Sequence, residues 1–222
     1  MERQFEKELN ELRKNLLKMG TLVEKAIHNA VKSLVERDSD LAQMIINCDT
    51  QIDKLEMDLE ESAIKLLALR QPMARDLRFI TKSIKIISSL ERIGDHAVNI
   101  CEKALQLNKE PQLKEYIDIP RMAEAAQMML KNALDAFINE DTTLAFKVCQ
   151  DDQIIDDLND QILRELLTYM LEDPRTITRA ILIIQISKYL ERIGDLATNI
   201  AESVIYMVEA RDIRHRSHLD KK

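Results

Sequence analysis

Apolar residues recur every three or four positions along almost the whole chain, which is the spacing of one face of an α-helix. The pattern divides into long segments separated by short polar stretches. The predicted helices span about residues 5–37, 40–69, 73–107, 120–139, 142–171 and 176–210. The four prolines fall between these segments and mark their ends. Long helices joined by short connections pack as antiparallel neighbours, so the pattern predicts an all-α protein.

One stretch of sequence occurs twice, one hundred residues apart. Residues 91–102 read Glu-Arg-Ile-Gly-Asp-His-Ala-Val-Asn-Ile-Cys-Glu, and residues 191–202 read Glu-Arg-Ile-Gly-Asp-Leu-Ala-Thr-Asn-Ile-Ala-Glu, with nine of twelve positions identical. A repeat of this period indicates two copies of one structural unit. We therefore predict two pseudo-symmetric antiparallel three-helix bundles, formed by residues 1–108 and 119–212, with a polar link between them and a frayed tail at 213–222.

The composition narrows the classes of function. A net charge of −7 argues against a nucleic-acid-binding protein, which would usually present a basic face, and is compatible with attracting cations. The N-terminus lacks a signal-peptide pattern, and no apolar run approaches the roughly 18 residues of a membrane span, so we expect a cytoplasmic protein without membrane insertion. Three cysteines without a CxxC spacing indicate reduced thiols. Cys48 lies on an apolar stripe, where we expect it to be buried.

Acidic residues form a second pattern in both halves. In each copy of the repeat two acids stand four positions apart, on the side of the helix roughly opposite its apolar stripe, and the second helix of each bundle carries another pair with this spacing. The eight acids are Asp49, Asp53, Glu91, Asp95, Asp152, Asp156, Glu191 and Asp195. Like charges at this spacing repel by only a few tenths of a kcal/mol, so a solvated acidic face is one interpretation. Because the arrangement is repeated, we favour the other: four carboxylates per bundle that hold one or more hard cations.

Other residues of the repeat have two readings each. Gly94 and Gly194 lie inside helices, where glycine costs about 1 kcal/mol relative to alanine, and either close helix packing or ligand access could require them. Arg92 and Arg192 could form salt bridges to a neighbouring helix or contact an anion or a partner. His96 has no counterpart in the second copy, and we expect it at the surface or beside a metal ligand rather than as a ligand itself.

The residues argue against an enzyme. Ferritin-like di-iron bundles use a Glu-x-x-His step, and none of the four histidines follows a glutamate by three positions. No Ser-His-Asp set, glycine-rich phosphate loop or zinc-ligand spacing is present. A carboxylate-bridged metal enzyme and a metal store remain as alternatives to a non-catalytic metal-binding protein.

The doubled Glu-Arg-Ile-Gly-Asp-x-Ala-x-Asn-Ile motif resembles that of the PhoU family of phosphate-transport regulators. The resemblance covers nearly the whole chain, and it includes Gln-Pro-Met-Ala-Arg-Asp-Leu-Arg at residues 71–78 and the step from Asp49 to Asp53. The second copy departs from the first upstream, where Thr176 and Thr178 replace Asp76 and Arg78, so any role of that pair belongs to one half only.

The resemblance implies a function that the residues alone do not establish. PhoU proteins consist of two three-helix bundles, commonly dimerise, and bind metal clusters through E/D-x-x-x-D motifs. Iron is the first candidate here, with zinc, manganese or magnesium also possible. The resemblance further implies a negative regulator of phosphate import and of phosphate-starvation signalling. Its implied partners are the ATPase subunit of the phosphate transporter, the phosphate-sensing membrane histidine kinase and a second copy of the chain.

Overall fold

A computed structural model describes residues 2–213; Met1 and residues 214–222, which make up nearly all of the predicted tail, lie outside the described residues. No β-strand occurs in residues 2–213. The elements are α1 (Glu2–Val35), α2 (Ser39–Cys48), α3 (Thr50–Arg70), α4 (Ala74–Leu107), α5 (Asp118–Asn139), α6 (Thr142–Glu172), the short 3-10 helix η1 (Pro174–Thr176) and α7 (Ile177–Glu209). No described helix combines the length and apolar character that a membrane span requires. The all-α prediction is confirmed.

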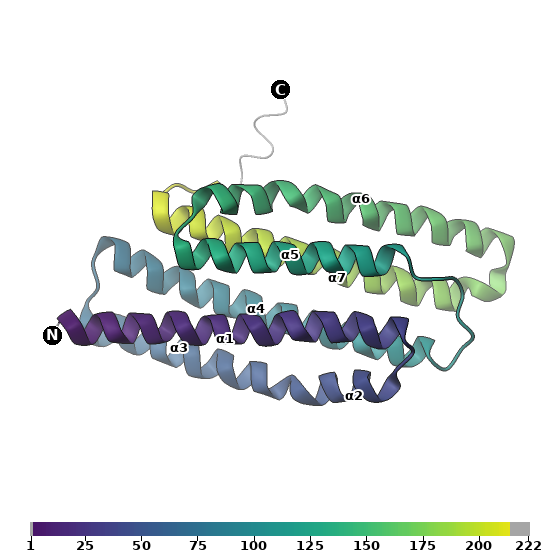
Figure 1. Ribbon diagram of the computed structural model, residues 1–222, viewed down its shortest axis with the longest axis horizontal. Helices are drawn as coiled ribbons and strands as arrows, with labels where there is room; N and C mark the ends of the chain where they lie inside the picture. Colours follow the sequence, from purple (N-terminus) through teal and green to yellow (C-terminus); the bar gives the residue numbers. More distant parts are fainter. Residues whose placement is uncertain (1, 214–222) are drawn as a thin grey trace, which may run out of the picture.

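The helices form two bundles that lie against each other (Figure 1). The first contains α1, α4 and the consecutive helices α2 and α3, which together act as one bent rod, and the second contains α5, α6 and α7. The two bundles meet along α4 and α7, and also where α1 contacts α5. Leu134 of α5 occupies the place that a Cβ on Gly20 of α1 would take, so this glycine permits the second contact.

Buried apolar residues from both bundles form one connected core. Phe79 at the start of α4 stacks on Phe137 near the end of α5, with ring centroids 5.3 Å apart, and the Arg13 guanidinium lies 4.9 Å from the Phe79 ring. The helix order and contacts confirm the predicted fold of two three-helix bundles. That residues 1–108 and 119–212 are separate domains stays a prediction.

The same turn begins the second helix of each bundle. Arg37 and Glu140 both have positive φ angles, of 57° and 54°, which end the preceding helix. Asp38 and Asp141 follow them, and the carboxylate of each accepts a hydrogen bond from the main-chain N–H three residues on, at 2.9 Å and 3.0 Å. Such caps satisfy one of the unpaired N–H groups of a helix start. The repeat therefore extends well beyond the motif that first indicated it.

The predicted helix at 40–69 is interrupted at one residue, Asp49, so that it consists of the consecutive helices α2 and α3. The residues around the break, Asn47-Cys48-Asp49-Thr50, all have modest helix propensity, and the Thr50 hydroxyl donates to the carbonyl of Asn47. At the equivalent place in α6, residues 150–153 read Gln-Asp-Asp-Gln, in which glutamine favours the helix, and α6 is continuous.

The segment between the bundles is irregular, as predicted, but it is held at both sides. The Arg37 guanidinium donates to the carbonyls of Asn108 at 2.8 Å and Glu110 at 2.6 Å, and Arg179 donates to the carbonyl of Pro111 at 2.9 Å. Helix α5 begins at Asp118, two residues earlier than predicted, and so contains a proline in its first turn. Proline is tolerated there because the first N–H groups of a helix have no partner within it.

Candidate metal sites

The first acid cluster is formed by α4 and the start of α3. Burial, followed by the charges of Asp53 and Asp95, raises the pKa of Asp49 to about 6. Burial also raises the pKa of Glu91 to about 7, with Asp95 the largest charged contributor and Glu56, Asp53 and Asp49 adding to it. Each carboxylate therefore lies in the field of acids on the other helix. The structure brings the four predicted acids of this half together.

Glu56 belongs to the same cluster, although the predicted set of four omits it. Its pKa is raised by burial first and then by Glu60, Asp53 and Asp95. Its position one turn after Asp53 was the only sequence signal, and it could not be distinguished there from other surface acids of α3.

The second acid cluster occupies the equivalent place on α6 and α7. Burial, then Asp195, Asp156 and Glu191, raises the pKa of Asp152 to about 6. The pKa values of Asp156 and Asp195 are also raised, by burial first and then by Glu191. This half differs in one respect: the Lys188 ammonium contacts both carboxylate oxygens of Glu191, at 2.7 Å and 2.9 Å. Residue 88, the counterpart of this lysine, is a serine, so the first cluster has no such internal cation.

The glycines of the repeat let the acid-bearing helices approach. A Cβ on Gly94 would lie 3.2 Å from the Ile52 side chain and 3.4 Å from a carboxylate oxygen of Asp49. In the second half a Cβ on Gly194 would lie 2.8 Å from Ile155 and 3.2 Å from a carboxylate oxygen of Asp152. Close helix packing, one of the two readings of these glycines, therefore accounts for them. The same contact also places one acid of each cluster against the neighbouring helix.

The clusters are not closed around a metal position. Within residues 2–213, no three His, Cys, Asp or Glu side chains are arranged so that they could already hold a metal ion. The donors are nevertheless suitable in kind, since carboxylate oxygens are the ligands of hard cations. The acids lie on exposed or partly exposed faces of their helices, where side-chain rotamers can change without repacking the core.

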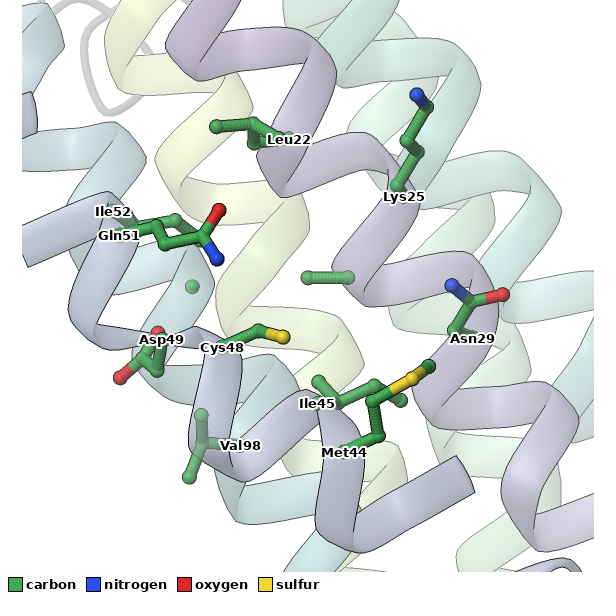
Figure 2. Close-up of a pocket in the computed structure, with 12 residues that line it drawn as sticks. Leu22, Lys25, Asn29, Met44, Ile45, Cys48, Asp49, Gln51, Ile52 and Val98 are labelled. Carbon is green, nitrogen blue, oxygen red and sulfur yellow. The ribbon is translucent and has the colours of Figure 1, made fainter. Parts of the chain in front are cut away.

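Cys48 lies beside the first cluster but is exposed, which corrects the prediction that it packs in the core. It lines a pocket of about 170 Å³ between α1 and the α2–α3 break, together with apolar side chains including Leu22 and Ile52. Figure 2 shows its sulfur pointing into this pocket while the Asp49 carboxylate points away from it. The helix stops at Cys48, so the apolar stripe does not continue along a straight rod and the side chain stays at the pocket edge.

His96 and the two repeated arginines lie near the contact between α4 and α7. The His96 ring stacks on Tyr189 of α7 with centroids 5.7 Å apart, so His96 lies half-buried between the bundles rather than at the surface. Burial, then Arg192 and Arg92, lowers its pKa to about 4, which keeps the ring neutral near pH 7. Neither arginine forms an ion pair within the described residues, which removes the salt-bridge reading.

Comparisons with known proteins agree on one family. The family model described as the PhoU domain matches the chain twice, at residues 16–104 and 119–204. A phosphate-specific transport system accessory protein PhoU homologue from Pseudomonas putida is 46% identical over 96% of this chain and 83% of that relative. The crystal structure of PhoU from Pseudomonas aeruginosa superposes with a TM-score of 0.90 at 44% identity, covering 93% of this chain and 100% of that one.

A second solved structure gives the same result. The phosphate transport system regulatory protein PhoU from Streptococcus pneumoniae has a TM-score of 0.88 at 32% identity, covering 94% of this chain and 99% of that one. The repeat and the two-bundle fold are thus shared over nearly the whole chain.

Proposed function

Since the chain belongs to the PhoU family, we propose that it is a metal-binding adaptor that represses phosphate import and phosphate-starvation signalling when phosphate is plentiful. It acts in the cytoplasm, as a homodimer and without catalytic turnover. Its partners are the ATPase subunit of the phosphate transporter and the phosphate-sensing membrane histidine kinase. The names of its relatives support the connection with phosphate transport.

The observation that carries the metal-binding part is the pair of acid clusters in equivalent places. Each is made by two neighbouring helices, and in each the acids raise one another's pKa, so the folded protein concentrates negative charge there. A bound cation, iron or else zinc, manganese or magnesium, would neutralise this charge and tie the two helices together. Asp49, Asp53, Glu91 and Asp95 are the ligands in the first bundle. Their counterparts in the second bundle are Asp152, Asp156, Glu191 and Asp195.

The test combines metal content with regulation in cells. The double variant Glu91→Gln/Asp95→Asn removes two ligands of the first cluster and keeps the helix-forming character of α4. We expect purified variant protein to lose about the metal share of one bundle by elemental analysis. In a strain that lacks the chromosomal gene, the variant should repress alkaline phosphatase less than the wild-type chain does in high phosphate.

The matched control is Glu6→Gln/Glu61→Gln, which removes the same charge from exposed positions outside the clusters. This control should retain both metal and repression. Equal metal content in the wild type and the cluster variant would show that the acids form a solvated face and do not bind the metal. Unchanged phosphatase expression after deletion of the gene would leave the regulatory role without support. Loss of metal with full repression would favour a metal store.

A further inference from the structure

A polar groove lies between α4 and α7. It borders the first acid cluster, because the charge of Arg92 in the groove offsets part of the rise that burial and Asp53 cause in the pKa of Asp95 in the cluster. Its volume is about 270 Å³, and basic and hydroxyl side chains dominate one wall. This wall belongs to α4. The facing wall belongs to α7, and Asp212, three residues beyond the end of α7, also lines the groove. The α4–α7 contact is the main one between the bundles, so the groove is placed at the junction of the two halves.

Four residues of α4 form a regular face toward this groove: Lys85, Ser88, Ser89 and Arg92. They are spaced i, i+3, i+4 and i+7, which places them on one side of the helix over two turns. The two cations lie about 10 Å apart along the axis, and the two hydroxyls lie between them. Both serines are partly buried, and both cationic side chains are exposed and form no ion pair within residues 2–213. Long basic side chains can fold inward over the hydroxyls from both ends.

The two serines of this face occur in only one copy of the repeat. In the second bundle the positions of Ser88 and Ser89 are held by Lys188 and Tyr189. Tyr189 stacks on His96 and fills the equivalent space, and Lys188 is bound to Glu191. The hollow therefore results from two small residues at these positions in one copy, and it is not a general consequence of packing two such helices together.

The facing wall adds the carboxylate of Glu202 and also includes Asn199 and Tyr206, and a second carboxylate, that of Asp212, lines the groove beyond the end of α7. Lys82 is only 8% exposed, and its ammonium lies 4.0 Å from the centre of the Tyr206 ring, so this end of the groove is rigidly packed. A carboxylate has about four acceptor positions and can receive a hydrogen bond in addition to other contacts. It repels a fully ionised oxyanion but accepts a hydrogen bond from one that still carries a proton.

We propose that this groove binds inorganic phosphate, as the hydrogen phosphate ion, between Lys85 and Arg92 over the hydroxyls of Ser88 and Ser89. The two cations and the Ser88 hydroxyl donate to the phosphate oxygens, and the remaining P–OH donates to Glu202. The Ser89 hydroxyl donates to the Lys85 carbonyl at 2.9 Å and turns from that carbonyl to the phosphate when the ion binds. Sulfate has no proton at neutral pH, so Glu202 disfavours it. The site deepens the proposed regulatory function by giving the protein its own phosphate input, but its chemistry does not depend on the acid clusters.

The experiment is isothermal titration of the chelator-treated full chain with sodium phosphate, and separately with sodium sulfate, at matched ionic strength. We expect one phosphate per chain with a Kd of about 1 mM or tighter, the range that a few charge-assisted hydrogen bonds supply, and weaker binding of sulfate. Arg92→Gln should raise the Kd roughly tenfold or more. The matched control Arg192→Gln changes the equivalent arginine of the second copy, which does not line the groove, and should leave binding intact.

Two further variants test the geometry. Ser89→Tyr introduces the side chain that fills the equivalent space in the second half and should abolish phosphate binding while the helical circular dichroism stays unchanged. Glu202→Gln should narrow the difference between phosphate and sulfate. Because the metal ligands are separate, Glu91→Gln/Asp95→Asn should still bind phosphate; if that variant loses metal and retains phosphate binding, the two sites are independent.

The outcomes that overturn the proposal are distinct from those that overturn metal binding. Absence of saturable phosphate binding, or equal loss of binding in Arg92→Gln and Arg192→Gln, would overturn it. So would binding to phosphatidylglycerol vesicles without binding to free phosphate, since the groove would then recognise a lipid headgroup. Metal content does not enter any of these results.

Discussion

Glu91→Gln should make the protein more stable at alkaline pH, although Glu91 belongs to the motif that the chain repeats. Glu91 is partly buried on α4 and faces the charges of Asp95, Glu56, Asp53 and Asp49. No lysine accompanies it, because Ser88 stands where the second half has Lys188. The glutamate is therefore held in an unfavourable field whenever it is ionised, and glutamine removes that charge with little change of shape.

The direction and size of this stability change follow from the pKa of Glu91, which burial and these acids raise from 4.5 to about 7. Between these two values the folded protein retains a proton that the unfolded chain has released, so the free energy of unfolding falls as pH rises through this window. At about 1.4 kcal/mol per pH unit, the full effect is at most about 3 kcal/mol. Solvent screens a partly exposed group, so we expect about 1 kcal/mol.

Urea unfolding followed by circular dichroism, in the presence of a chelator, measures this at pH 5 and pH 8. The variant and the wild type should be nearly equal at pH 5, and the variant should be more stable by about 1 kcal/mol at pH 8. The matched control is Glu191→Gln, which removes the ion pair with Lys188 and should give no stabilisation at either pH. Parallel pH profiles for wild type and Glu91→Gln, or equal stabilisation by the two variants, would refute the reasoning.

Two other predictions concern packing and the link between the bundles. Gly194→Ala should destabilise the protein by about 1 kcal/mol more than Gly94→Ala in urea unfolding, because its new methyl meets Ile155 at 2.8 Å whereas the other meets Ile52 at 3.2 Å, and both gain the same helix propensity. Equal effects would contradict this. Arg37→Ala should cost about 1–3 kcal/mol and speed limited proteolysis within residues 108–117, because three carbonyls lose a charged donor; equal cleavage rates would refute it.

The sequence alone predicted the helices and which acids group together. Helical periodicity is set by burial of one face, and long uninterrupted stripes make that signal strong. The spacing of Glu91 and Asp95 places both on one face whatever the tertiary structure. That Asp49 and Asp53 face them from another helix required only that the helices be antiparallel neighbours. The repeat then supplied a second, independent instance of the same arrangement.

Helical periodicity does not predict where a helix is interrupted or which neighbouring side chain a given residue contacts. The break at Asp49 results from several residues of modest helix propensity in succession, each of which alone is compatible with a helix interior. The position of His96 depends on how α4 crosses α7, which no one-dimensional pattern specifies. The exposure of Cys48 follows from the break, so one unpredicted feature produced a second error.

Two of the differences between the copies, Ser88 for Lys188 and Ser89 for Tyr189, change the charge and the space around α4. Ser88 in place of a lysine leaves Glu91 without a counterpart of the Lys188–Glu191 contact, and Ser89 in place of a tyrosine leaves room for the groove. Helix α4 therefore carries an acid cluster in which Arg92 is a cationic influence on Asp95, and a groove with two cations that form no ion pair within residues 2–213, Lys85 and Arg92. In the second bundle Lys188 pairs with Glu191, and Tyr189 stacks on His96. A cation bound on one face and an anion bound on the other would each stabilise the same helix, so ligand-dependent changes in stability should be larger in the first bundle than in the second.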